Sequence, residues 1–134
     1  MQQYSFQVRT GQDFAVVDIT DRVAQWVTDR GDGLLNVLAP HATAGLALLE
    51  TGSGTEADAQ TALEAILPRD NRWVHRHGSP GHGADHVLPL LVSSTLTLPV
   101  TGGRLDLGTW QSIALVDPNV DNAVRTVRLS FLSS

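Results

Sequence analysis

The first seventeen residues alternate between apolar and polar positions. Phe6 and Val8 are separated by a polar residue, and Val16 and Val17 form a second short apolar run beyond the polar segment 11–13. A period of two is typical of a strand that buries one face. Because glycine and polar residues between two such runs favour a turn, this segment predicts an opening β-hairpin.

Two later segments have helical spacing instead. Val23, Trp26 and Val27 lie at i, i+3 and i+4, after a cap expected at Thr20 or Asp21. A second helix is expected after a cap at Ser53 or Thr55 and before Pro68, with these residues facing the core: Ala59, Ala62, Leu63, Ile66 and Leu67. A third, short helix is expected to begin at Asp85 and to end at Leu91 or Val92.

The remaining apolar runs predict strands at 34–39, 46–49, 95–100, 104–107, 113–116 and 124–132, with a turn at Pro118-Asn119. Short turns join most of these strands, and strands joined in this way pair antiparallel. We therefore expect an α+β fold: one domain over residues 1–134, a mostly antiparallel sheet or sandwich, and two or three short helices.

Composition narrows the class of function. The formal charge is −5, and the nine cationic side chains are all arginine without a basic block, which argues against a nucleic-acid surface. The absence of cysteine excludes disulfides and thiolate ligands. No apolar run approaches about 18 residues and no signal peptide is recognisable, so we expect a cytoplasmic protein without a membrane segment. Only 17% of the residues are charged, which favours association into an oligomer.

Histidine is the residue type that suggests chemistry. His41 follows a predicted strand, His86 lies near the start of the third helix, and three more histidines lie in the irregular segment 69–85: His75, His77 and His82. Long irregular segments in small domains are often functional. Neutral imidazole binds first-row metals, and three such ligands with one open position form a catalytic zinc site. The predicted helices place no two histidines on one helical face, so spacing alone does not select the ligands.

Three further sets of polar residues are candidates. Glu50 ends an apolar strand, where a carboxylate can act as general base or orient a metal ligand. Thr109 and Gln111 offer neutral hydrogen bonds in a glycine-containing turn. Arg125 and Arg128 lie an odd number of positions apart in the last strand, so they should point to opposite faces of the sheet and only one should reach a given pocket.

Several segments resemble the YjbQ-like family. Residues 41–46, followed by Glu50, are similar to its His-Thr-Ser-Ala-Gly segment, and residues 94–100, 103–105 and 107–113 are similar to its signature, which includes Leu-Gly-Thr-Trp-Gln. The resemblance runs from about residue 4 to residue 132. His75 and His86 fit the two other histidine positions of the family, whereas His77 and His82 have no clear counterpart.

The resemblance implies a trimeric α+β protein with a histidine-lined pocket and a weak thiamine-phosphate synthase activity. It implies a divalent metal on His41, His75 and His86, with zinc as the first candidate. It further implies catalytic roles for His41 and Glu50 and substrate contacts from Thr43, Thr109, Gln111, Arg125 and Arg128. Thr51, Ser53 and Thr55 replace a polar series of the family, and a family lysine after His86 is missing.

Three interpretations follow. The chain is a small-molecule enzyme with a metal and an open coordination position. Alternatively, it is a trimer that binds a small ligand without changing it. In the third interpretation the histidines only form hydrogen bonds at a subunit interface, and replacing them affects assembly first. Three histidine ligands favour zinc, whereas magnesium is the better metal for a departing pyrophosphate. This mismatch weakens the case for a dedicated thiamine-phosphate synthase.

Overall fold

Two antiparallel sheets and three helices form the part of the chain that the computed structural model describes, residues 1–118 and 121–134. The first sheet has the order β1 (Gln2–Arg9), β8 (Val124–Ser133), β3 (Gly33–Leu38), β5 (Thr95–Thr101) and β6 (Arg104–Leu105). The second has the order β2 (Ala15–Asp18), β7 (Ser112–Asp117) and β4 (Gly45–Leu49). The helices are α1 (Thr20–Val27), α2 (Thr55–Ile66) and α3 (Gly83–Val87), and a 3₁₀ turn (Leu88–Leu90) follows α3. The predicted α+β fold is confirmed.

One apolar core joins both sheets and α1. On β3, Leu35 is fully buried and pairs with Leu98 of β5 on one side and Phe131 of β8 on the other. Ile113 of β7 brings the second sheet into the same cluster, and Val27 brings α1 into it. Because inward positions alternate with exposed ones along these strands, the period-two pattern predicted most of the strands correctly.

The predicted opening hairpin is wrong. The strands β1 and β2 form as expected, but β1 pairs with β8 and β2 pairs with β7, in different sheets. Between them the backbone N–H groups of Thr10 and Gly11 both donate to the carbonyl of Ala123, at 2.9 and 3.1 Å. The chain therefore crosses from one sheet to the other instead of turning back on itself. The turn expected at Pro118-Asn119 includes Asn119, which lies outside the described residues.

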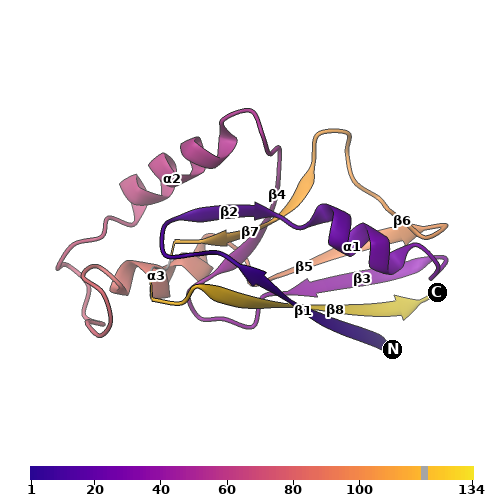
Figure 1. Ribbon diagram of the computed structural model, residues 1–134, viewed down its shortest axis with the longest axis horizontal. Coiled ribbons are helices and arrows are strands. Elements are labelled where there is room, and N and C mark those ends of the chain that lie inside the picture. The colour runs from indigo at the N-terminus through magenta and orange to yellow at the C-terminus, as the bar shows by residue number, and fades with distance from the viewer. Residues whose placement is uncertain (119–120) are drawn as a thin grey trace.

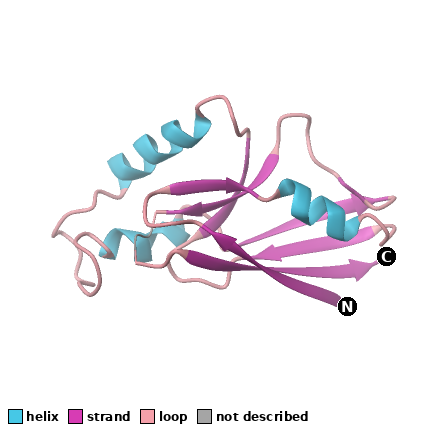
Figure 2. Ribbon diagram, viewed as in Figure 1, coloured by secondary structure: helices cyan, strands magenta, loops and turns pink. Residues whose placement is uncertain are grey.

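Helix α2 does not face the core as predicted. None of its residues is buried, and Ile66 is 60% exposed. Only Leu63 and the following Leu67 join a small second cluster, with Leu88 beyond α3. Figures 1 and 2 show α2 on the same side of the molecule as α3, away from the five-stranded sheet, so α2 has little core to cover.

The expected helix caps are also different. The residue before α1 is Ile19, and the Asp18 carboxylate accepts hydrogen bonds from both the N–H and the hydroxyl of Thr20. Helix α2 follows Gly54, whose φ of 95° is a left-handed conformation that glycine adopts without strain. In the described residues no helix is long and apolar enough to cross a bilayer.

Candidate metal centre

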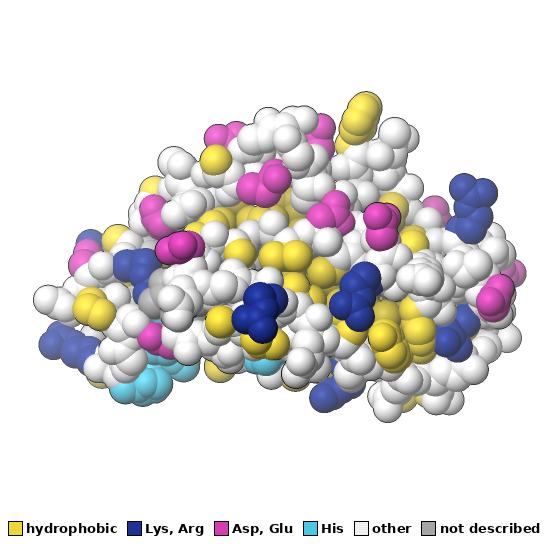
Figure 3. All heavy atoms as spheres, in the orientation of Figure 1, with side chains coloured by type: hydrophobic (Ala, Val, Ile, Leu, Met, Phe, Trp, Pro, Cys, Tyr) yellow, Lys and Arg dark blue, Asp and Glu magenta, His cyan; other side chains and the backbone are white. Residues whose placement is uncertain are grey.

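Four histidines come together beside α3, and we call them the four-histidine cluster: His75, His77, His82 and His86. One ring nitrogen of each lies within 4.8 Å of the others. In a tetrahedral zinc site with bonds of about 2.0–2.1 Å, the nitrogens would lie roughly 3.3 Å apart. Shifts of about an ångström would therefore close the cluster around an ion. Figure 3 shows histidine side chains gathered on the surface at one end of the molecule.

Helical geometry positions two of the four. His82 has helical backbone angles directly before α3, and His86 lies one turn later. Residues at i and i+4 project from the same side of a helix, and the Nε2 atoms of the two rings lie 3.0 Å apart. The i, i+4 pair was not predicted, because the helix was expected to begin only at Asp85. The segment His82-Gly-Ala-Asp-His86 carries the signal, provided that the helical turn begins before Gly83.

Close packing brings the loop histidines to the same place. A Cβ atom on Gly83 would lie 2.4 Å from the Cβ of Trp73 and 2.6 Å from the carbonyl oxygen of His75. Only glycine lets the loop approach the first turn of α3 so closely. The indole of Trp73 also donates to the carbonyl of Pro68 at 2.8 Å. Farther along the loop, the backbone N–H and the hydroxyl of Ser79 both donate to the carboxylate of Asp121.

Two carboxylates lie next to the ring of His82, although neither forms a well-aligned hydrogen bond with its Nδ1 atom. Its Nδ1 atom lies 3.1 Å from Asp121 Oδ2 and 3.3 Å from Asp85 Oδ2. His82 is 6% exposed and Asp85 is 1% exposed. The pKa of Asp85 is raised because burial outweighs its ion pair with Arg69. Acceptors beside Nδ1 favour the tautomer with the proton on that atom, which leaves the Nε2 lone pair directed at the cluster. Carboxylates hold metal-binding histidines in this way.

The pKa shifts of two histidines in the cluster suit a metal. Desolvation, and after it the neighbouring histidines, lower the pKa of His75 and of His86. Both imidazoles are therefore neutral at pH 7. Only the neutral form has a lone pair to give to an ion.

His41, the third histidine of the expected metal site, lies apart from this cluster. Its Nε2 atom accepts the backbone N–H of Thr126 at 2.9 Å. Within the described residues of one chain, the structure joins His75 and His86 to His77 and His82, and His41 is not among them.

Thr43 and Arg125 belong to a buried ion-pair network. The guanidinium of Arg125, 2% exposed, donates from Nε and Nη2 to Asp117 at 2.7 and 2.9 Å, and from Nη2 to the Thr43 hydroxyl at 2.8 Å. The hydroxyl of Thr10 also donates to Asp117. Arg128 is exposed, so the two arginines do lie on opposite faces of the sheet.

The remaining expected site residues are on the surface. Glu50, Thr109 and Gln111 are exposed, and the Gln111 side chain accepts the backbone N–H of Gly108 at 2.9 Å. Trp110 between them is 74% exposed. The structure places none of these residues in the group of potential metal ligands among the described residues.

His41 gives a pH prediction. Burial and the charge of Arg125 lower its pKa below the ordinary 6.5. The unfolded chain therefore takes up this proton at a higher pH than the folded chain does. Stability should be unaffected above about pH 6.5 and should fall as the pH drops below it. The His41→Gln variant, which keeps an acceptor for Thr126, should lose less stability between pH 7 and pH 5 in urea unfolding. Parallel curves for the two proteins would contradict this.

Comparisons with known proteins agree with the fold and leave the chemistry open. A family model described as UPF0047 protein YjbQ-like matches residues 4–134. A UPF0047 protein of Mycobacterium tuberculosis (strain H37Rv) is 56% identical over 117 residues, which are 87% of this chain and 88% of that protein.

Two solved structures are similar over nearly the whole chain. A hypothetical protein from Aeropyrum pernix K1 has a TM-score of 0.89 and 32% identity, and the match covers 100% of both chains. A YbjQ-like protein of unknown function from Sulfolobus solfataricus P2 has a TM-score of 0.91 and 26% identity, over 99% of this chain and 97% of that one.

Fold and site together define a small α+β protein with two antiparallel sheets and a histidine cluster at one end. The chain belongs to the UPF0047 (YjbQ-like) family.

Proposed function

We propose that the chain is a metal-dependent small-molecule enzyme whose four-histidine cluster binds a divalent transition metal. One observation carries the proposal: four imidazole nitrogens, from a loop and a helix, lie within 4.8 Å of one another. Imidazole ligands without thiolate suit zinc, and also copper or nickel, better than magnesium or calcium. We take zinc as the first candidate.

The arrangement of the ligands supports an open coordination position. His82 and His86 are fixed by the helical turn, and His75 is held where its backbone meets Gly83. His75 and His77 are both exposed, but the backbone of His75 is packed against Gly83, so His77 is the ligand that we expect to leave the ion and admit water or substrate. Three imidazoles with one exchangeable position suit zinc catalysis, in which the metal lowers the pKa of bound water to about 7 or polarises a substrate oxygen.

Arg76 supports an anionic substrate. Its guanidinium donates to the carbonyl oxygens of Trp73 and Asn71, both at 2.9 Å, and it forms no ion pair among the described residues. It lines the same surface depression as His75 and His82. Neutral carbonyl groups do not cancel the positive charge of the guanidinium, so Arg76 can still pair with a carboxylate or phosphate group of a substrate. The thiamine-phosphate synthase reaction, whose substrates carry phosphate, is therefore a reasonable first assay.

The presence of four histidines also favours a second candidate function, in which the metal is structural. Four protein ligands can close a zinc site, and closed sites are structural. In that case the metal would hold the loop against α3 while the depression beside it binds a ligand without turnover. Binding without chemical change separates this candidate from the enzyme.

The deciding experiment is elemental analysis of tag-free protein. We expect about one zinc per chain in the unmodified protein, almost none in the His82→Ala, His86→Ala double variant, and an unchanged content in His41→Ala. Zinc retained by the double variant would contradict the proposed site, whereas zinc lost from His41→Ala would place that residue at the metal. The same samples serve to measure thiamine-phosphate formation and, by light scattering, the expected trimer.

A further inference from the structure

A second pocket lies between α2 and α3. Its walls are mostly apolar and come from four segments of the chain: Phe14, Leu63, Leu67, Ala84, Leu88 and Pro118. Its volume is about 210 Å³. An apolar protein cavity of about 150 Å³ is large enough to bind benzene, so this one has room for a small ring with a short substituent.

The pocket is separate from the four-histidine cluster. On the turns of α3 and the 3₁₀ segment after it, Ala84 and Leu88 are four residues apart and face the pocket. His82 and His86 are also four residues apart. Each lies two residues before its counterpart in the pair Ala84 and Leu88, and two residues correspond to a rotation of about 200° around a helix. The two sets of side chains therefore lie on opposite sides of this segment.

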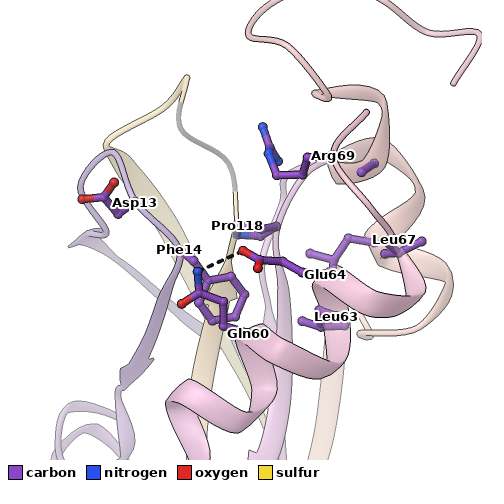
Figure 4. A pocket seen from close by; sticks show the side chains of 10 residues that line it. Asp13, Phe14, Gln60, Leu63, Glu64, Leu67, Arg69 and Pro118 are labelled. Carbon is purple, nitrogen blue, oxygen red and sulfur yellow. Dashed lines mark hydrogen bonds between the residues drawn. The ribbon is translucent and has the colours of Figure 1, made fainter. Parts of the chain in front are cut away.

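The charge at the pocket is negative. Figure 4 shows the Glu64 side chain reaching from α2 towards Phe14, while Asp13 points away from the other labelled side chains. Gln60 Nε2 donates a hydrogen bond to Glu64 Oε1 at 2.9 Å. Arg69 also lines the pocket, but its charge is offset by the ion pair with buried Asp85. The net charge offered to a ligand is that of the Glu64 carboxylate.

The packing of α2 is consistent with an unfilled site. The helix has no buried residue, and Leu63 on its inner side is only partly buried. The side of α2 that faces α3 therefore borders a hollow instead of a filled core. The hollow is open to water, and an apolar ligand that replaces this water removes apolar surface from solvent and gains dispersion contacts.

We propose that this pocket is a second binding site, for a small apolar molecule that carries a protonated amine. The ring or chain fills the space between Phe14, Leu63 and Leu88, and the ammonium group donates to the Glu64 carboxylate. Neutral analogues lose the ion pair, and carboxylates are repelled by Glu64.

Three ligands of similar size test the proposal: benzylamine, benzyl alcohol and benzoate. Each is titrated into the full-length protein at pH 7, and binding is followed by heteronuclear NMR. We expect shifts at the residues that line the pocket. Because Glu64 is exposed, we expect benzylamine to bind about two- to fivefold more tightly than benzyl alcohol, with benzoate the weakest. Glu64→Gln should remove the difference between benzylamine and benzyl alcohol. Asp58→Asn, an exposed carboxylate of the same helix that does not line the pocket, should preserve it.

Several results would overturn the proposal. They are a benzylamine affinity unchanged by Glu64→Gln, an equal affinity for benzyl alcohol and benzylamine in the unmodified protein, or no shifts at the pocket residues with any of the three ligands. Because Glu64 is exposed, the variant should fold normally, and its unfolding midpoint is the check.

Discussion

Replacing Arg125 by methionine should lower the free energy of unfolding by about 3–5 kcal/mol, because it leaves the Asp117 carboxylate as a buried charge without its cation. Asp117 is fully buried, and Arg125 donates to both of its carboxylate oxygens. The same change removes the hydrogen bond to Thr43. Urea unfolding monitored by circular dichroism measures the effect.

The matched control is Arg128→Met, three positions further along β8 but on the exposed face. We expect that variant to change stability by no more than about 0.5 kcal/mol. A second check is the double variant Arg125→Met, Asp117→Leu, which removes both charges and should recover much of the loss. Equal effects of the two arginine substitutions would show that the buried pair contributes nothing specific.

Only part of this ion pair could be predicted from the sequence. The odd spacing of Arg125 and Arg128 predicted opposite faces, and the burial of the two side chains confirms it. The sequence could not tell that Arg125 faces an aspartate of β7, because β7 and β8 belong to different sheets. Local patterns report which face a residue occupies, whereas its partner depends on how the sheets pack.

The error at the first two strands has the same origin. Both strands were predicted correctly because alternation is a local property of the chain. Their pairing was wrong because Thr10 and Gly11 bond to Ala123, more than a hundred residues away. Only the packed structure contains that contact.

For the candidate site, the sequence singled out histidine and the irregular segment 69–85, but not the set of four histidines that the structure brings together. His75 and His86 were expected together, and they do lie together. His77 and His82 were left aside for lack of a counterpart in the family. A helical turn that includes His82 would have revealed its i, i+4 relation to His86, but helix ends are the least certain part of any sequence-based reading.

Asp85→Asn should weaken zinc binding by about 10- to 100-fold, although Asp85 is not expected to touch the metal. Its Oδ2 atom lies 3.3 Å from Nδ1 of His82, the buried member of the cluster. The carboxylate favours a proton on Nδ1 and makes Nε2 a better donor to the metal. Asparagine keeps the shape but loses the charge, and its amide group can present a donor to Nδ1 in place of an acceptor.

Competition with a chromophoric chelator measures the affinity, and the unfolding midpoint of the metal-free protein shows whether the fold has changed. Asp70→Asn is the matched control, since Asp70 lies in the same loop but is exposed and paired with Arg72. It should bind zinc as the unmodified protein does. Asp121→Asn should fall between the two, because Asp121 Oδ2 also lies near His82 Nδ1, at 3.1 Å, but is more exposed than Asp85. If Asp85→Asn matched Asp70→Asn in affinity, the carboxylate would have no part in orienting His82. The four histidines would then have to hold the ion through their own positions on α3 and the loop.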